Sequence, residues 1–302
     1  MVEAIALGNS ARRRTSPNPW VGALVVDHEG TVVGRGATEP PGGRHAEIVA
    51  LAQAGERAIG STVVCTLEPC SHHGRTGPCT DALIAAGVAR VVVGVQDPDP
   101  NVAGAGLRRL EDAGLEVLVG IEAPAVSTSL SPYLHHRKTG RPQVLLKMAA
   151  TLDGRTAAPD GSSQWITGPA ARADVHRLRA DADAILVGAG TVRADDPELT
   201  ARLDPAAERQ PLRFVLGEIL DDLGRRGILQ LLVEGGASVA KELLDAGCVD
   251  RLVLYLAPVL FGGDDGRPLF AGAGAGTMEE LRRGRFVSIA QLGEDLRVEV
   301  EP

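Results

Sequence analysis

Short β-branched runs alternate with short helical segments along the whole chain, and this alternation constrains the fold most. Strands that alternate with helices of this length are typical of α/β domains with at least partly parallel sheets. In the first half, the expected strands are 21–27, 31–36, 61–70, 90–96 and 115–120, and the expected helices are 45–55, 79–88 and 106–114. In the second half, the expected strands are 143–152, 184–188, 211–216, 228–234 and 251–260, and the expected helices are 171–182 and 237–247.

A polar segment that contains both breaker residues, 138–142 (Lys-Thr-Gly-Arg-Pro), separates the two halves. A chain of 302 residues has room for two domains, and linkers are typically polar and rich in Gly and Pro. We therefore expect two domains, 1–140 and 141–302.

Composition excludes several classes of function. The net charge of −8 and an aromatic content of 3% argue against a nucleic-acid partner, because such proteins need positive fields and stacking platforms. No apolar run reaches the roughly 18 residues of a membrane span, so no membrane partner is expected. The basic residues near the N-terminus follow the apolar ones, unlike a secretory signal. The four cysteines thus read as reduced thiols of a cytoplasmic protein.

The strongest local signal is a set of metal-binding side chains, His45, Cys70 and Cys79. One imidazole and two thiolates suit Zn²⁺, and three protein ligands leave the fourth tetrahedral position open for water, as in catalytic sites. Glu47 lies two residues past His45 at the start of an expected helix. That spacing lets its carboxylate reach a metal-activated water and move a proton without being a ligand. The sequence therefore predicts one catalytic zinc ion per chain.

Two other interpretations of these residues are open. A closed zinc knuckle with His72 or His73 as fourth ligand would make this half a non-catalytic, zinc-stabilised binding module, and the thiols could also be ordinary core residues. Zinc nucleobase deaminases carry the pattern H-x-E…P-C-x-x-C. This chain matches it through Pro69 and Cys70, but eight residues rather than two separate its cysteines.

Further motifs resemble one family over nearly the whole chain, the bifunctional riboflavin-biosynthesis deaminase–reductases. The long spacing between the two cysteines distinguishes that family from cytidine and tRNA-adenosine deaminases. The motifs are Thr-Ser-Pro-Asn-Pro at 15–19, His-Ala-Glu at 45–47, Glu-Pro-Cys-Ser-His-His-Gly-Arg-Thr at 68–76 and Gln-Asp-Pro-Asp-Pro-Asn at 96–101. The resemblance implies a cytidine-deaminase-like three-layer α/β/α domain followed by a dihydrofolate-reductase-like α/β domain, and a homo-oligomer.

For the first half, the resemblance implies a pyrimidine ribosyl phosphate as substrate. The family deaminates 2,5-diamino-6-(5-phosphoribosylamino)pyrimidin-4(3H)-one to 5-amino-6-(5-phosphoribosylamino)uracil. Asn18 and His72 would contact the base or ribose, Arg75 the phosphate, and Asp97 and Asp99 the sugar hydroxyls. Asp99 stands where the family usually has Asn, and Gly77 where it usually has Pro.

The second half has weaker signals of its own. Glycines at 188–190 and 235–236 follow expected strands, but neither group completes G-x-G-x-x-G, so spacing alone favours tight turns. The resemblance implies an NADPH-dependent reductase that converts the ribosyl chain to ribityl, with Lys147 and Asp195 as catalytic residues. The implied cofactor contacts are Ala149, Trp165, Thr191, Asp195, Gly235, Gly236 and Ala237. The implied substrate contacts are Ser163, Arg179, Leu199, Arg202 and Glu234.

One departure concerns this second half. After the expected strand 211–216 the family continues through further strand and helix segments, whereas here 217–228 leads almost at once to the next strand. A deaminase whose second domain is only a degenerate scaffold is therefore an alternative. Among the other residues, we expect Cys65 and Cys248 to lie in the core. The three arginines at 12–14 are interpreted as a solvated helix end, and His135 and His136 as solvated helix positions. His176 is expected to be a helix residue without a function.

Overall fold

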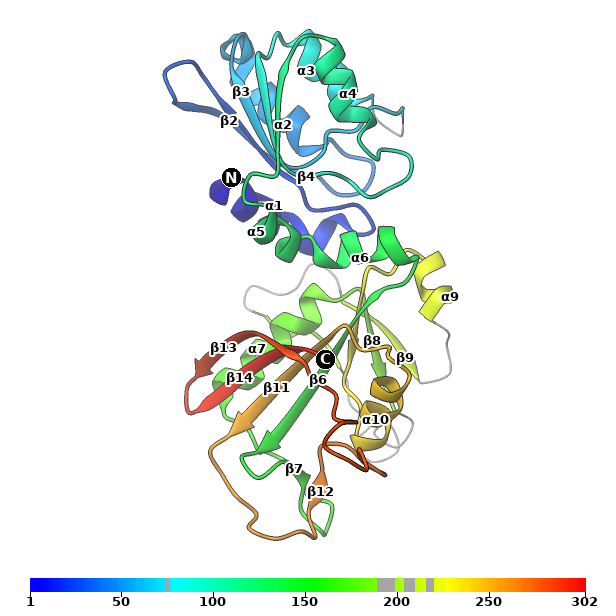
Figure 1. Cartoon of the computed structure of the whole chain (residues 1–302). Coiled ribbons are helices and arrows are strands. Elements are labelled where there is room, and N and C mark those ends of the chain that lie inside the picture. Colours follow the sequence, from blue (N-terminus) through cyan, green and yellow to red (C-terminus); the bar gives the residue numbers. More distant parts are fainter. Residues whose placement is uncertain (74–76, 189–198, 204–209, 216–219) are drawn as a thin grey trace. The chain divides into compact units, whose positions relative to one another are not determined.

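A computed structural model describes residues 1–73, 77–188, 199–203, 210–215 and 220–302, and side chains are described outside 213–215. It divides the chain into two compact units, Met1–Arg141 and Pro142–Pro302 (Figure 1). In the described part, no helix is both long and apolar enough to cross a bilayer.

The first unit is built on a five-stranded sheet in the order β2-β1-β3-β4-β5. β1 pairs antiparallel with β2 and β3, whereas β3, β4 and β5 are parallel. The strands are β1 Gly22–Val26, β2 Val32–Ala37, β3 Thr62–Leu67, β4 Arg90–Val95 and β5 Glu116–Val119. The expectation of a partly parallel α/β sheet is confirmed.

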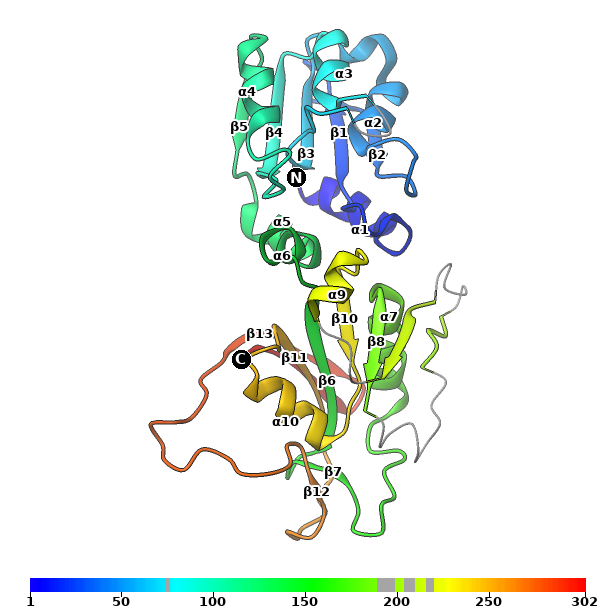
Figure 2. The ribbon, with the colours of Figure 1, turned by 90° about the vertical axis from the view of Figure 1, so that its right-hand side faces the viewer.

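Helices cover both faces of this sheet. Added Cβ atoms at Gly22 and Gly36 would meet α1 and α2 respectively, and the two positions lie on opposite faces of paired strands β1 and β2. Helix α2 also contacts α3, which contacts α4, while α1 contacts α5. The helices are α1 Val2–Thr15, α2 Ala46–Ala54, α3 Cys79–Ala85, α4 Ala105–Asp112, α5 Ala123–Ser129 and α6 Ser131–Thr139, with a 3₁₀ turn at Gly55–Ala58. This is the three-layer α/β/α arrangement (Figure 2).

The second unit contains a seven-stranded sheet in the order β13-β14-β11-β6-β10-β8-β9. The strands from β11 to β9 are parallel, and β14 and β13 add an antiparallel hairpin at one edge. The strands are β6 Gln143–Thr151, β8 Ala184–Val187, β9 Leu212–Val215, β10 Gln230–Val233, β11 Arg251–Ala257, β13 Arg285–Leu292 and β14 Asp295–Glu301. A two-stranded ribbon joins β7 Arg155–Ala157 to β12 Arg267–Pro268, and the helices are α7 Pro169–Asp181, α9 Leu220–Arg225 and α10 Ala237–Asp245.

The central strands of this sheet are buried on both faces. Along β10, Leu231 and Val233 belong to an apolar cluster covered by α10, and Leu232 belongs to a cluster covered by α7. Residues buried on both sides produce continuous apolar runs rather than alternation. That is why these strands are visible in the sequence.

Three single-residue interpretations can be compared with this fold. Cys65 is fully buried in β3, as expected. Cys248 is only half-buried after α10, so its interpretation as core is wrong. His136 is buried on the inner face of α6, so its interpretation as solvated is also wrong. Adjacent helix residues point about 100° apart, so one of two neighbouring histidines can face inward.

The start of α2 is set by a close approach to β2. A Cβ atom at Gly36 would lie 2.0 Å from the carbonyl oxygen of Ala46, the first residue of α2. Only glycine permits this distance, because a side chain would push the helix away from the sheet.

We expect Gly36→Ala to destabilise the protein by about 1–3 kcal/mol, the usual result of overpacking. The same change should displace the start of α2 and lower zinc content. Thermal unfolding and metal analysis would measure both effects. Gly274→Ala is the control, because a Cβ atom there meets nothing within 4 Å, and both values should match the unaltered protein. An unchanged melting temperature for Gly36→Ala would contradict this account.

Candidate active sites

Three segments of the first unit bring His45, Cys70 and Cys79 together. His45 precedes α2, Cys70 follows β3 and Cys79 opens α3. Their donor atoms lie within 4.8 Å of one another. His45 Nδ1 is 3.2 Å from Cys79 Sγ and 3.5 Å from Cys70 Sγ. Because Nδ1 faces both sulfurs, it is the ring nitrogen placed to act as a ligand.

This donor set fits zinc chemically, since one imidazole and two thiolates match the ligand preference of Zn²⁺. In the described part of the chain, the group of mutually close metal-ligating side chains has these three members, and neither His72 nor His73 belongs to it. The arrangement therefore favours a three-ligand site over the closed four-ligand knuckle.

The two thiols interact through a hydrogen bond. Hydrogen bonds with Cys79 and His45 together lower the pKa of Cys70 to about 4, against the opposing effect of burial. The same contact with Cys70, together with burial, raises the pKa of Cys79. The Cys70 sulfur also accepts a hydrogen bond from the Cys79 backbone N–H at 3.4 Å. Cys70 is thus held in the thiolate form that binds metals.

Glu47 is the second residue of α2 and is 4% exposed. Burial raises its pKa to about 7. A carboxyl group with a pKa near neutrality can both accept and release a proton. Its position in the same cavity wall as His45 and Cys70 makes it the candidate acid–base group.

A cavity of about 450 Å³ opens onto this donor set. Of the five expected substrate contacts, the structure places Asn18, His72, Asp97 and Asp99 in its lining. The fifth, Arg75, lies outside the described residues. Asp97 and Cys70 line the same cavity because they follow the parallel strands β4 and β3, which end at the same sheet edge.

Among the lining residues that the sequence did not single out are Glu68, Tyr133 and Arg137. Glu68 is buried, and its carboxylate accepts hydrogen bonds from the backbone N–H groups of Asp97 (3.2 Å), Gly104 (3.0 Å) and Gly106 (2.9 Å). It thereby fastens the segment after β4 to the end of β3. Its place beside Pro69 and Cys70 was the available signal for it.

Tyr133 and Arg137 come from α6 and bind the two aspartates. The Tyr133 hydroxyl donates to Asp97 Oδ2 at 3.0 Å, and burial raises the pKa of Asp97. Arg137 Nε lies 3.2 Å from Asp99 Oδ2. No local motif marks either residue, because their partners lie more than 30 residues away in the sequence.

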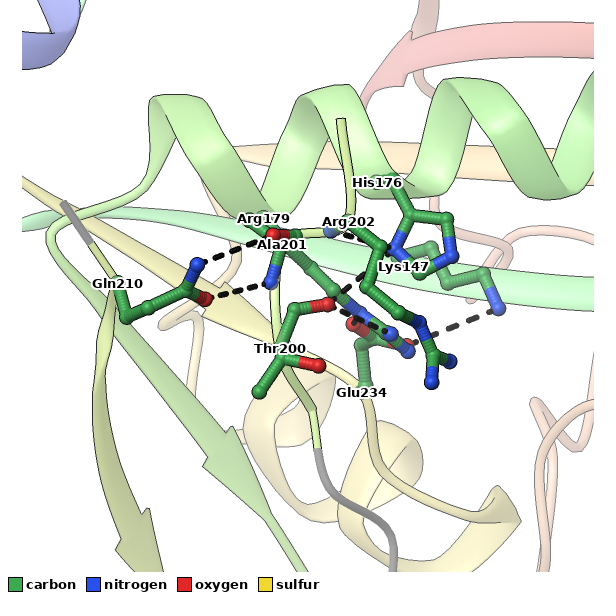
Figure 3. A network of polar contacts seen from close by, with 8 residues as sticks. All are labelled: Lys147, His176, Arg179, Thr200, Ala201, Arg202, Gln210 and Glu234. Carbon is green, nitrogen blue, oxygen red and sulfur yellow. Dashed lines mark hydrogen bonds and ion pairs between the residues drawn. The ribbon is translucent and has the colours of Figure 1, made fainter. Parts of the chain in front are cut away.

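The second unit contains a partly buried ionic cluster of Lys147, Arg179 and Glu234 (Figure 3). Arg179 Nε and Nη2 lie 2.6 and 2.9 Å from the two Glu234 oxygens, and Lys147 Nζ lies 4.0 Å from Glu234 Oε2. Burial lowers the pKa of Lys147. Burial opposes ionisation of Glu234, but hydrogen bonding to Arg179 and the charge of Lys147 keep its pKa below the usual value.

The short segment Thr200–Arg202 is held against this cluster from two sides. The Thr200 carbonyl lies 3.2 Å from His176 Nδ1 and accepts a hydrogen bond from Arg179 at 3.4 Å. The Gln210 amide donates to the Ala201 carbonyl and accepts from the Ala201 N–H (Figure 3). His176, which the sequence left without a function, and Gln210 thus fix the backbone next to Arg202.

The other expected residues of this unit lie as follows. Gly235 and Gly236 form the turn between β10 and α10, which begins at Ala237. Trp165 is 69% exposed with the Arg172 guanidinium 4.8 Å from its ring centroid, and Ser163 nearby is also exposed. Ala149 is half-buried on β6, and Leu199 is packed in the apolar core. Thr191 and Asp195 lie outside the described residues.

Comparisons with known proteins match both units. Residues 1–95 match the family model "cytidine and deoxycytidylate deaminase zinc-binding region", and 142–221 and 216–298 match "RibD C-terminal domain". The riboflavin biosynthesis protein RibD of Mycobacterium tuberculosis is 45% identical over 322 residues, which covers 97% of this chain and 94% of that protein.

Solved structures agree with this match. RibD of Acinetobacter baumannii has a TM-score of 0.91 at 35% identity, covering 100% of this chain and 97% of that one. A diaminohydroxyphosphoribosylaminopyrimidine deaminase/5-amino-6-(5-phosphoribosylamino)uracil reductase from Thermotoga maritima has a TM-score of 0.91 at 32% identity with the same coverage.

The alignment with the M. tuberculosis protein also locates a difference in length. It runs over 322 positions, more than the 302 residues of this chain, so the relative contains residues without a counterpart here. The C-terminal domain model matches in two pieces that meet at 216–221. This agrees with the short connection that the sequence shows at 217–228.

We expect the purified protein to contain about one zinc ion per chain, and Cys79→Ala to lose it, because two donors rarely retain zinc. Metal analysis after dialysis would measure this. The matched control is Cys248→Ser, whose thiol is outside the donor group and half-buried, and which should keep its zinc. Full zinc content in Cys79→Ala would show that the ion binds elsewhere.

Proposed function

This chain belongs to the RibD family of bifunctional deaminase–reductases of riboflavin biosynthesis, and we propose that each unit carries out one of the two reactions. The first unit would deaminate diaminohydroxyphosphoribosylaminopyrimidine. The second would reduce the product, 5-amino-6-(5-phosphoribosylamino)uracil, with NADPH. The observation that carries the first assignment is the three-donor group with buried Glu47 beside it in one cavity.

In the deamination, the residues of this chain bind the base and move protons. Zinc held by His45, Cys70 and Cys79 would supply a Lewis acid that activates water. Glu47 accepts the proton released when water attacks the ring carbon, and then donates it to the departing amino group, which leaves as ammonia. Water is consumed, and the carbon–nitrogen bond is replaced by a carbonyl.

The opposite wall would hold the sugar. Asp97 and Asp99 line the cavity, and Glu68 holds the segment after β4 against the end of β3 through hydrogen bonds from the backbone N–H groups of Asp97 and Gly104. Asn18 and His72 would contact the base or ribose. A substrate fixed at both ends reacts faster, because the attacking and leaving groups are already aligned.

In the reduction, NADPH would supply the hydride. Lys147 would donate a hydrogen bond to the reacting sugar centre, and the ion pair of Arg179 with Glu234 would keep the lysine in place. The turn at Gly235–Ala237 would accept the cofactor pyrophosphate, because α10 begins there with unpaired backbone N–H groups. Trp165, Ala149, Thr191 and Asp195 would border the nicotinamide of the cofactor. Ser163, Leu199 and Arg202 would contact the substrate.

The shortened connection near 216–221 favours a second candidate function, in which the second unit is a scaffold and only deamination occurs. NADPH titration separates the two. We also propose that the protein works in the cytoplasm, because a donor set with two thiols needs a reducing compartment.

We expect Glu47→Gln to keep its zinc and lose ammonia release by about 10²- to 10⁴-fold, the usual contribution of a general acid–base group. An ammonia assay with metal analysis would measure both. Glu56→Gln, an exposed position on the following 3₁₀ turn, is the control and should behave like the unaltered protein. Near-normal ammonia release by Glu47→Gln would refute the role of Glu47.

We expect Gly236→Ala to fold normally and to weaken NADPH binding by about 10-fold or more, since a tenfold loss needs only about 1.4 kcal/mol. A Cβ atom at this position meets nothing within 4 Å, so it obstructs only a ligand that approaches the turn. Fluorescence titration with NADPH and a thermal scan would test this. Equal NADPH affinity in Gly236→Ala and the unaltered protein would place the cofactor elsewhere. Saturable micromolar binding of NADPH to the unaltered protein would exclude the interpretation of the second unit as a scaffold.

A further inference from the structure

The lining of the deaminase cavity is strongly acidic. It contains four carboxylates and, in the described part of the chain, a single guanidinium, that of Arg137. The carboxylates are Glu47, Glu68, Asp97 and Asp99. A phosphorylated substrate brings one to two further negative charges. Such a ligand would be repelled from this wall unless a cation met its phosphate.

Most of the acidic groups already have partners. Glu68 is surrounded by backbone N–H donors, and Asp97 accepts from the Tyr133 hydroxyl and from the Asp99 N–H at 2.9 Å. Of the other two, Glu47 interacts with Cys79 of the donor group, and Asp99 is paired with Arg137. The Asp99–Arg137 pair is therefore the place in the described lining where a guanidinium offsets the negative charge.

The geometry prepares Arg137 to bind an anion. Its Nε faces Asp99, and its guanidinium lies 5.0 Å from the centroid of the Tyr133 ring. The side chain is 28% exposed, so it is partly desolvated and still accessible. A guanidinium has five N–H donors, and one carboxylate contact leaves others for a phosphate. A side chain held in advance loses little entropy on binding.

Its position also suits the far end of the substrate. In the sheet order β2-β1-β3-β4-β5, helix α2 with His45 packs on β2 and β1, and Cys70 follows β3. Asp99, the ion-pair partner of Arg137, follows β4, which lies on the other side of β3 from β1. A base at the donor group would thus direct its ribose and phosphate toward Arg137.

We propose that Arg137 binds the phosphate of the substrate in the deaminase cavity and makes this unit selective for the phosphorylated ribosyl pyrimidine. This inference rests on the proposed deaminase function and adds a residue to it. Arg137 acts on specificity and takes no part in the proton transfers assigned to Glu47.

The test compares ammonia release from the phosphorylated substrate and from the same compound after phosphatase treatment. The measured quantity is the ratio of the two kcat/KM values. We expect Arg137→Gln to reduce this ratio by about 10- to 100-fold, mainly through KM for the phosphorylated compound, since hydrogen bonds to charged groups have this strength. Arg137→Lys should recover part of it, because it keeps the charge.

Matched variants separate binding from structure. Arg137→Gln leaves Asp99 without its cation, so the double variant Asp99→Asn/Arg137→Gln is made as well, and it should show the same loss of ratio. Asp99→Asn alone removes the ion pair and keeps the cation, so its ratio should equal or exceed that of the unaltered protein. Zinc content and melting temperature verify that each variant folds.

Two results would overturn the proposal. One is an equal fall in kcat/KM for both compounds in Arg137→Gln, which would mean that the residue only supports the wall. The other is a reduced ratio in Asp99→Asn equal to that in Arg137→Gln. If the unaltered protein deaminates neither compound, the proposed function fails instead. In that case, calorimetry would measure the affinity of the unaltered protein and of Arg137→Gln for ribose 5-phosphate. Equal affinity in the two proteins would refute the role of Arg137 in phosphate binding.

Discussion

The whole deaminase site depends on one geometric constraint, the approach of α2 to the sheet at Gly36. His45, Cys70 and Cys79 lie on three separate segments, and each reaches the donor group because α2 starts, β3 ends and α3 starts at the same place. The approach at Gly36 fixes the first of these segments, and the parallel pairing of β3 with β4 fixes where Asp97 lies relative to Cys70. The chemistry of the site thus follows from backbone packing beneath it.

Both units keep charged groups buried, and each does so with specific partners. Glu68 is satisfied by backbone N–H groups, whereas Glu234 is satisfied by the two-pronged contact with Arg179. Removing one partner of such a pair leaves an uncompensated buried charge, which costs more than the pair contributes. These contacts consequently fix positions around the reacting groups more than they add to overall stability. Glu47 is the exception, since the effect of burial outweighs the charge of His45 and raises its pKa.

The shortened connection of the second unit leaves its central elements in place. β9 pairs with β8 at the edge of the sheet, and the cluster of Lys147, Arg179 and Glu234 lies on β6, on α7 and after β10. The two-sided core around β10 is complete without additional strands.

The sequence determined the features that are encoded locally. Continuous apolar runs predicted the strands buried on both faces, such as β8 and β10, and the deaminase motifs predicted which His, Glu and Cys would lie together, because a motif carries its own turn geometry. The hairpin β13–β14 was missed, although residues 296–301 of β14 alternate apolar and charged side chains as a half-buried strand does. Tyr133, Arg137, His176 and Gln210 were missed for another reason. Each acts through a partner distant in sequence or through backbone atoms, and only the tertiary structure decides which helix face meets which loop.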